Sequence, residues 1–238
     1  MKAVILAGGM GTRGRPYTEY FPKAMIPVNG RPLIDHIVGY LRTFPFIGEI
    51  VIVADFEGLG AQIRGYYNRQ KGISFVQDSQ SGTGGDLIHA ESRLGAESEF
   101  VLWFVDNLCA IDLGAMRKEF RDKKSTVCIA TRKKRREETG FAAVQDGIIT
   151  RFSEKPVLEL PMSECLGIYM MRREVMGRIR SVRAKKINLS YDVLQKLSGE
   201  GRVSAFDIGN TRWMDVESPM VLDRNREDVR HITGRMES

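Results

Sequence analysis

The sequence predicts a three-layer, Rossmann-like α/β fold, with a mostly parallel, mixed central sheet covered by helices on both faces. Two observations lead to this prediction. Apolar runs of strand length alternate along the chain with amphipathic segments of helix length. The runs are apolar throughout rather than at alternate residues, as in strands that are buried on both sides. Ligands of such sheets bind at the carboxyl ends of the strands, so a site is expected there.

The first half of the chain predicts the parallel part of the sheet. The expected strands are residues 3–7, 50–54, 73–77, 100–105 and 126–131. The helices expected between them are residues 32–41, 59–67, 86–94 and 113–121. This alternation of strand and helix is the repeating unit of a parallel sheet.

The pattern changes after Gly140. Two short strands, residues 141–145 and 148–152, are joined by Asp146-Gly147, which is a strong hairpin signal, so a small antiparallel hairpin flap is expected. The remaining expected elements are strands 165–171 and 203–206 and helices 172–180 and 191–197. No repeat or linker divides the chain, which predicts a single domain over residues 1–218 and a short helical tail over residues 219–238.

The composition is that of a globular protein with one core, because 42% of the 238 residues are hydrophobic. No apolar run approaches the roughly 20 residues of a membrane span, and the first apolar run is too short for a signal peptide. A cytoplasmic protein without a membrane partner is therefore expected. Cys109, Cys128 and Cys165 lie far apart in apolar surroundings, so we expect reduced core residues rather than a metal site.

The net charge of +6 fits either a nucleic acid or a small anion as the partner. The one dense basic run, residues 132–136, is followed at once by Glu137 and Glu138 and contains no aromatic residue. A surface that binds single-stranded nucleic acid interleaves its cations with aromatic side chains. We therefore expect a solvated loop at this run and no nucleic-acid partner.

A glycine-rich segment follows the first strand and runs from Gly8 to Lys23. Part of it matches the dinucleotide fingerprint, G-x-G-x-x-G, but no periodic helix begins after Gly14. That fold also needs an acidic residue about 20 positions further on, and Asp55 at the end of the second strand lies too far along the chain. A Walker loop fails as well, because Lys23 lacks the preceding Gly and the following Ser or Thr.

The segment is nevertheless suited to a polyanion. Its glycines let backbone amides approach phosphate, Arg13 and Lys23 supply fixed cations, and Pro16, Pro22 and, just beyond the segment, Pro27 stiffen the chain. A flexible loop with solvated cations would not need these prolines. The segment therefore predicts a binding site for a triphosphate.

Residues 6–28, from Leu6-Ala7-Gly8-Gly9-Met10-Gly11-Thr12-Arg13 through Pro22-Lys23 to Val28, resemble the signature of the sugar nucleotidylyltransferase family. Further similarities follow in the order of that family: Gln77, Gly82-Thr83-Gly84-Gly85, Asp106, Glu154-Lys155-Pro156, Gly167-Ile168-Tyr169 and Trp213-Met214-Asp215. The resemblance covers nearly the whole chain. It implies a fold of the nucleotide-diphospho-sugar transferase type and a single catalytic domain.

The resemblance also implies a reaction between an NTP and a sugar 1-phosphate. A phosphate oxygen of the sugar 1-phosphate attacks the α-phosphorus of the NTP in line, and pyrophosphate leaves. In that reaction Arg13 would hold the β- and γ-phosphates, Lys23 the α-phosphate and Lys155 the phosphate of the sugar. The residues implied in NTP binding are Leu6, Ala7, Gly8, Gly9, Gly11, Thr12, Gln77, Gly82 and Thr83.

A magnesium ion would complete this site, with Asp106 and Asp215 as its ligands, because Mg²⁺ prefers hard oxygen ligands. Without the rest of the motif, Asp106 could equally be a turn residue at a strand end. The residues implied in binding the sugar phosphate are Gly140, Glu154, Lys155, Gly167 and Asp192.

The chain departs from the family pattern mainly on the sugar side, near Cys165 and Ser190, and Glu217 stands where a glycine is usual. A cytidylyltransferase for an alcohol phosphate such as phosphocholine therefore stays open, as does a regulatory homologue that binds nucleotide sugars without turnover. For Asp86 we favour a carboxylate in the first turn of a helix over a role in base recognition. The resemblance further implies homodimers or homotetramers, and it leaves the base and the sugar undetermined.

Overall fold

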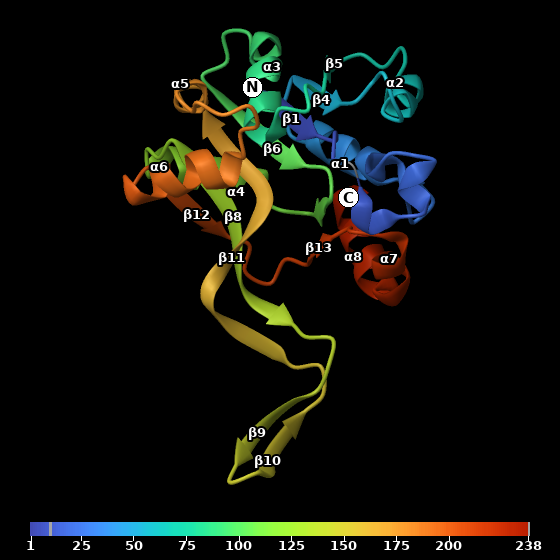
Figure 1. Cartoon of the computed structure of the whole chain (residues 1–238), viewed down its shortest axis with the longest axis vertical. Helices are drawn as coiled ribbons and strands as arrows, with labels where there is room; N and C mark the ends of the chain where they lie inside the picture. Colours follow the sequence, from blue (N-terminus) through green and yellow to red (C-terminus); the bar gives the residue numbers. More distant parts are fainter. Residues whose placement is uncertain (10, 238) are drawn as a thin grey trace.

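A computed structural model of the chain, which describes residues 1–9 and 11–237, contains a seven-stranded mixed sheet in the order β12-β8-β11-β6-β1-β4-β5 (Figure 1). The strands are β1 (Lys2–Leu6), β4 (Glu49–Ala54), β5 (Ile73–Gln77), β6 (Glu99–Phe104), β8 (Val127–Arg136), β11 (Val157–Arg172) and β12 (Val203–Asp207). Neighbours run parallel except β11, which is antiparallel to both β6 and β8. The predicted mixed, mostly parallel sheet is confirmed.

The sheet reverses its winding direction at β1. The chain passes from β1 to β4 and β5 on one side and then returns to β6 on the other side of β1. The carboxyl ends of these four parallel strands therefore meet at one edge, on either side of the reversal. A crevice at such a point is the usual ligand site of an open α/β sheet.

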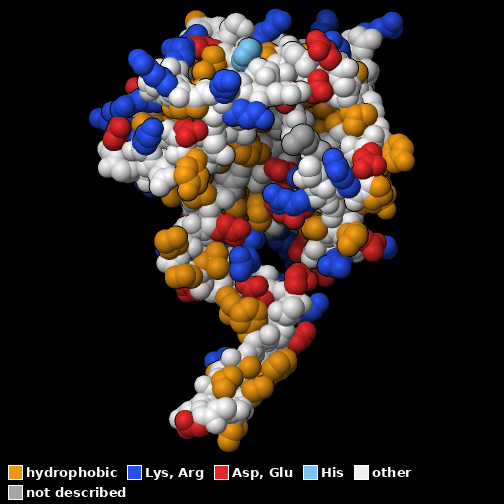
Figure 2. All heavy atoms as spheres, in the orientation of Figure 1, with side chains coloured by type: hydrophobic (Ala, Val, Ile, Leu, Met, Phe, Trp, Pro, Cys, Tyr) orange, Lys and Arg blue, Asp and Glu red, His pale blue; other side chains and the backbone are white. Residues whose placement is uncertain are grey.

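Two strands leave the sheet and form a long arm, residues 133–164 (Figure 1). The outer part of β8 pairs with the first part of β11, from Val157 opposite Arg136 to Glu159 opposite Lys134. The arm ends in a hairpin of β9 (Phe141–Gln145) and β10 (Ile148–Ser153). The expected hairpin is present, but it stands at the end of the arm, away from the body of the molecule (Figure 2).

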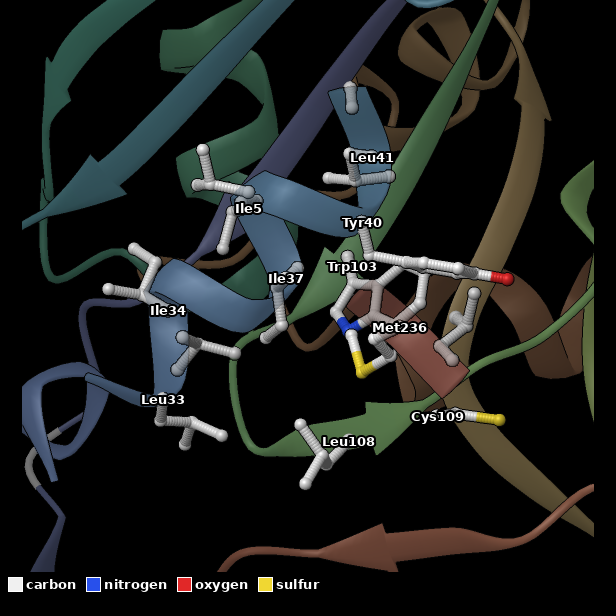
Figure 3. Packing of buried hydrophobic residues seen from close by; sticks show 14 of the residues in the cluster. Ile5, Leu33, Ile34, Ile37, Tyr40, Leu41, Trp103, Leu108, Cys109 and Met236 are labelled. Atoms are coloured by element: carbon white, nitrogen blue, oxygen red, sulfur yellow. The ribbon is translucent and has the colours of Figure 1, made fainter. Parts of the chain in front are cut away.

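Helices cover both faces of the sheet, which makes three layers. They are α1 (Leu33–Arg42), α2 (Ala61–Tyr66), α3 (Gly82–Leu94), α4 (Leu113–Asp122), α5 (Val175–Arg180), α6 (Gln195–Gly199), α7 (Pro219–Arg224) and α8 (Arg226–Glu237). Successive residues of β1 point to opposite faces, so Ile5 packs in the core under α1 and α4, and Val4 packs in the core under α3 and α5. Figure 3 shows the first core, where Trp103 packs among side chains of α1 and Met236 of α8.

The segment expected as a helical tail holds α7 and α8. Ile232 and Met236 of α8 are buried in the core beside α1, and Arg31 pairs with Glu237. Just before these helices, the short strand β13 (Trp213–Asp215) pairs antiparallel with β7 (Asn107–Cys109). The last helices are thus packed on the sheet. A second short ribbon joins β2 (Pro27–Val28) to β3 (Arg31–Pro32).

Several expectations need correction. The basic run at residues 132–136 is part of β8 and not a loop, because β11 supplies backbone hydrogen-bond partners along it. Cys109 and Cys128 are buried as expected, but Cys165 is exposed where β11 leaves the sheet. The helix expected from Asp86 begins earlier, at Gly82. The helix expected over residues 191–197 is a wide helical turn (Leu189–Leu194) followed by α6.

Among the described residues, none of the helices has both the length and the apolar character that crossing a membrane requires.

Candidate functional site

A cavity of about 530 Å³ opens at the edge of the sheet where the four parallel strands end. Its lining comes from the loops that follow these strands and from the start of α3. The lining residues are Leu6, Ala7, Gly8, Gly9, Thr18, Pro22, Lys23, Asp55, Leu59, Gly60, Asp78, Gln80, Gly82, Thr83, Asp86, Phe104, Val105, Asp106 and Lys186. The cavity therefore lies at the reversal point of the sheet, and it is large enough for a small-molecule ligand.

The floor of the cavity is backbone of the glycine-rich segment. A Cβ atom at Gly8 would lie 1.8 Å from Oδ2 of Asp78, so a larger residue there would have to displace the Asp78 carboxylate. Further along, Thr18 Oγ1 donates to Gly11 O at 2.7 Å, and its methyl group would lie within 2.8 Å of a Cβ atom at Gly11 or Gly14. Thr18 thus fixes the return of the loop, and the glycines allow that close packing.

Lys23 lies between two carboxylates at the edge of the cavity. Its Nζ donates to Asp106 Oδ2 at 2.9 Å and lies 3.9 Å from Asp215 Oδ1. The Lys23 side chain is 14% exposed and the two carboxylates are about a third exposed, so the ion pairs are only partly screened by water. The structure therefore brings together three of the predicted residues from widely separated parts of the chain.

Asp215 is short of partners in this cluster. Its Oδ1 atom is shielded from solvent and accepts no hydrogen bond within the described residues. Burial, with the nearby Asp106 carboxylate as a second cause, raises the pKa of Asp215, and Lys23 opposes this rise. A buried carboxylate oxygen without a donor, beside a second carboxylate, has the chemistry of a site for a hard divalent cation.

Asn107 fixes the Asp106 carboxylate and links its strand to the strand that carries Asp215. Its Nδ2 donates to Asp106 Oδ1 at 2.8 Å, and its Oδ1 accepts from Trp213 Nε1 at 2.8 Å and from Gly167 N at 2.9 Å. A Cβ atom at Gly167 would lie 2.2 Å from Asn107 Nδ2, so the glycine makes room for this amide. The pairing of β7 with β13 sets Asn107 directly opposite Asp215. A buried amide thus joins the strand that follows Asp106 to the strand that ends at Asp215.

A loop that contains Lys186 and Ile187 also lines the cavity and packs on the start of α3. Gly84 N donates to Ile187 O at 2.9 Å, and Ile187 N donates to Ser81 O at 2.7 Å. A Cβ atom at Gly82 would lie 2.6 Å from Ile187 O, so glycine permits the contact. This loop carries Lys186 to the cavity, where Lys23 and Lys186 are the two cations of the described lining.

Asp86 is a buried member of the lining. The side chain is 9% exposed and its Oδ1 accepts from Ser79 Oγ at 3.1 Å and Ser79 N at 3.3 Å. Burial and the neighbouring Asp78 carboxylate raise the pKa of Asp86 to about 6. The predicted first-turn carboxylate is wrong, because α3 starts at Gly82 and Asp86 lies in its second turn, where it holds the loop before the helix.

Comparison with protein families decides the family of the chain. The family model described as nucleotidyl transferase matches residues 2–225. The chain belongs to the nucleotidyl transferase family. The sequence-based assignment to this family is confirmed.

Three similar proteins illustrate this membership. A mannose-1-phosphate guanyltransferase of Aspergillus oryzae is 30% identical, over 92% of this chain and 61% of that protein. The bifunctional protein GlmU of Methanococcus maripaludis is 27% identical, over 100% of this chain and 58% of that protein. A Bacillus anthracis structure in complex with a sucrose, which carries the name of a glucose-1-phosphate thymidylyltransferase, is 25% identical with a TM-score of 0.76 and covers 98% of this chain and 96% of that chain. The chain thus spans about 60% of the length of these curated relatives.

In this nucleotidyl transferase, some predicted site residues line the cavity and others do not. Those that line it are Leu6, Ala7, Gly8, Gly9, Lys23, Gly82, Thr83 and Asp106. Gly11, Thr12 and Arg13 are not part of the lining: a short 3₁₀ turn over Thr12–Gly14 follows Gly11, and the Arg13 guanidinium is ion-paired with Glu217. Asp192 accepts from Asn188 N at 2.7 Å, so it closes a helical turn instead of lining the cavity.

The predicted residues of the arm lie outside the cavity. Gly140, Glu154 and Lys155 stand where the tip hairpin joins the rest of the arm, with Lys155 N donating to Thr139 O at 3.2 Å. The structure therefore does not bring Lys155 to Lys23 and Asp106.

Gln77 also lies outside the lining, because its side chain has other partners. It donates to Asp55 Oδ1 at 2.9 Å and accepts from Phe56 N at 2.9 Å. Asp55 and Asp78 face the cavity in its place. Both directly follow strands, so their position at strand ends was the signal that could have identified them. For Lys186 the sequence carries no comparable signal, since only the loop packing brings it to the cavity.

The raised pKa of Asp86 predicts a pH-dependent stability. Below pH 4 the carboxyl is protonated in both the folded and the unfolded chain, whereas above pH 6 the folded state carries an ionised, buried carboxylate. Stability due to this group is therefore present at low pH and lost as pH rises from about 4 to about 6. Asp86→Asn keeps an acceptor for Ser79 and should be more stable than the wild type at pH 7.5, by about 2 kcal/mol.

Urea unfolding followed at pH 4, 5, 6 and 7.5 measures this difference. The gap between variant and wild type should widen across that range. Two unfolding free energies that run parallel with pH would contradict the role given to Asp86.

Proposed function

We propose that the protein is a sugar-1-phosphate nucleotidylyltransferase, which converts an NTP and a sugar 1-phosphate to a nucleotide sugar and pyrophosphate. The observation that carries the proposal is the cluster of Lys23, Asp106 and Asp215 beside a cavity floored by glycine backbone. Membership of the nucleotidyl transferase family and the names of the relatives support it. The same cluster has no counterpart in a dinucleotide-binding site, which needs a glycine loop and a ribose-binding acid.

The reaction is a displacement at the α-phosphorus of the NTP. A new bond forms from a phosphate oxygen of the sugar 1-phosphate to that phosphorus, and the bond to the oxygen bridging the α- and β-phosphates breaks. Negative charge grows on the equatorial oxygens and on the departing pyrophosphate. Lys23 Nζ, already fixed by two carboxylates and largely removed from water, stabilises that charge without reorganising.

We further propose that Asp106 and Asp215 hold a magnesium ion, in keeping with the Asp215 oxygen that has no donor. Among the described residues no group of three or more acidic, His or Cys side chains forms a metal cage. Two carboxylates suffice for Mg²⁺, because this ion usually takes its remaining ligands from water and substrate phosphates. When bound, Mg²⁺ would neutralise phosphate charge and orient the triphosphate.

Lys186 is proposed as a second contact for the triphosphate or the nucleoside. It lines the cavity together with Lys23 and with the Asp55, Asp78 and Asp86 carboxylates. The acceptor is proposed to be a sugar phosphate. A phosphocholine-type acceptor needs an aromatic cage for its cationic head, and Phe104 is the one aromatic residue of the described lining. Free cysteines and the use of NTPs support a cytoplasmic location.

Removing Lys23 or Asp106 should abolish most turnover. We expect Lys23→Ala and Asp106→Asn each to lower kcat/KM by about 100- to 1,000-fold, because each removes a fixed charge from the transition state. Pyrophosphate release is measured with Mg²⁺ for each common NTP against a panel of sugar 1-phosphates. Wild-type protein that releases pyrophosphate with none of these pairs would overturn the proposed reaction.

Lys186 offers a test with a matched control in the adjacent residue. Lys186→Ala should raise the KM for the NTP about tenfold with a smaller change in kcat, because a ground-state contact is lost. Lys185→Ala removes an equal charge from outside the lining and should leave both constants near the wild-type values. Equal effects of the two substitutions would show that only the net charge of the loop matters.

A second function, a regulatory homologue without turnover, is favoured by one specific observation. Arg13, which is expected to bind the β- and γ-phosphates, is ion-paired with Glu217. Glu217 itself stands where the family usually has a glycine. The pair is exposed, so its energy is small, but it occupies the guanidinium with a carboxylate of the chain itself. A triphosphate must displace Glu217 to reach Arg13.

Glu217→Gln should release Arg13 and lower the KM for the NTP about threefold, because the competing carboxylate is gone. Glu227→Gln, at another exposed carboxylate that pairs with Arg212, is the control and should change nothing. Thermal unfolding with added nucleotide sugar completes the comparison. Stabilisation by nucleotide sugars of a wild type that shows no turnover would favour the regulatory function.

A further inference from the structure

The proposed reaction brings two anions together, so the phosphate of the acceptor needs a cation as much as the NTP does. Lys23 is placed beside the phosphates of the NTP in this proposal, and two carboxylates already share it. Lys155, the residue expected to hold the phosphate of the sugar, stands on the arm outside the cavity. In this structure the cation for the acceptor must therefore come from another part of the chain.

Arg132 is a cation in contact with the residues that surround Asp106. Its guanidinium lies over the Trp213 ring, with 4.4 Å between Cζ and the ring centroid. Trp213 Nε1 donates to Asn107 Oδ1, and Asn107 Nδ2 in turn donates to Asp106. Trp213 and Asp215 are two residues apart on β13, so their side chains point to the same side of this strand. A chain of direct contacts thus connects the Arg132 guanidinium to the proposed magnesium carboxylates.

The Arg132 side chain is held on two sides. Glu164 lies directly opposite it in the pairing of β8 with β11, and Arg132 Nε donates to Glu164 Oε2 at 2.7 Å. The Trp213 ring covers one face of the guanidinium, and only 18% of the Arg132 side chain is exposed. An arginine that is fixed in this way loses little conformational entropy when it binds a ligand.

The outer end of this guanidinium is not used by the protein. Among the described residues, the terminal nitrogens Nη1 and Nη2 of Arg132 donate to no acceptor, and both are accessible to solvent. Arg121 differs, because it binds the Glu99 carboxylate through both Nε and Nη2. Two adjacent guanidinium nitrogens form a planar fork that matches two oxygens of a phosphate. Arg132 therefore offers a rigid, partly buried fork to an anion.

The order of the strands places Arg132 beyond the end of the cavity that carries Asp106. The cavity lies at the ends of β6, β1, β4 and β5, whereas β11 and β8 follow on the other side of β6. Asp106 comes directly after Val105, which follows β6, and marks the boundary between the two regions. Glu164 lies close enough to this boundary to add to the raised pKa of Asp215, after the larger effects of burial and of Asp106. An acceptor that attacks an NTP bound in the cavity has to approach from beyond Asp106, alongside β11 and β8.

We propose that Arg132 binds the phosphate of the sugar 1-phosphate through Nη1 and Nη2 and holds it for attack on the α-phosphorus of the NTP. The inference rests on the proposed function, and it gives Arg132 the role that the sequence led us to expect of Lys155. Glu164 and Trp213 act as positioning residues, because they fix one edge and one face of the guanidinium. They leave its outer end to the substrate.

Arg135 provides a matched control, because it lies on the same strand and also pairs with a glutamate, Glu137, but on the exposed arm. Kinetics are measured with the NTP and the sugar 1-phosphate that together release pyrophosphate fastest. Arg132→Gln should raise the KM for the sugar 1-phosphate about 30-fold and leave the KM for the NTP within about twofold. Arg132→Lys keeps the charge without the fork and should raise the same KM about fivefold. Arg135→Gln should leave both constants near the wild-type values.

Thermal unfolding checks that each variant is folded, and Arg132→Lys, which keeps a cation for Glu164, carries the test if Arg132→Gln is unstable. A wild type that releases no pyrophosphate with any pair overturns the proposed reaction and this inference together. An active wild type whose KM for the sugar 1-phosphate is unchanged in both Arg132 variants overturns this inference alone. Equal rises of the two KM values also overturn it, because Arg132 would then act only by supporting Trp213. The same holds if Lys155→Ala raises the KM for the sugar 1-phosphate and the Arg132 variants do not.

Discussion

The ion cluster of Lys23, Asp106 and Asp215 is the interaction on which the site depends. Burial, and after it repulsion by the Asp106 carboxylate, raises the pKa of Asp215, which reflects the cost of placing two carboxylates together here. Lys23 makes the pair tolerable, and it stands there because the glycine-rich segment returns to the sheet edge after Thr18 packs on Gly11. On the other side, the Asn107 amide and the pairing of β7 with β13 keep the carboxylates together. The reversal of the sheet at β1, the return of the glycine-rich segment and the pairing of β7 with β13 thus together position this small group of charges.

The buried strands and the exposed tip hairpin were well predicted from the sequence, whereas the two strands that connect this hairpin to the sheet were not. Strands such as β1 and β6 are buried on both faces, so their apolar runs stand out against the helices. The outer part of β8 and the first part of β11 have no such pattern, because neither face of this two-stranded ribbon is covered. Basic residues can therefore occupy its strands as readily as apolar ones. Its strand character comes from pairing between β8 and β11, which no local pattern near Arg132 reveals.

For the candidate site, the prediction was strongest where a residue's role follows from its place on the backbone. Glycines of the floor and the strand-end Asp106 are of this kind. The prediction was weakest where a side chain can choose between a ligand and a partner within the protein. Asp55 and Phe56 hydrogen-bond the Gln77 amide, and Glu217 forms an ion pair with Arg13. Lys186 reaches the cavity only through a loop that is distant in sequence from α3. Spacing along the chain does not encode these contacts, and that is why they were missed.

The glycines at the start of α3 affect how far the Gly82-Thr83-Gly84-Gly85 motif can be used to infer catalytic activity from a sequence. Gly82 and Gly84 leave the room that Ile187 needs, whether or not a nucleotide is ever bound. A descendant that lost its catalytic charges would still be under selection to keep these glycines, because larger residues would push the Ile187 loop off the helix. Their presence in a genome sequence therefore marks inherited architecture. Evidence that such a protein is catalytically active must come from its charged residues instead.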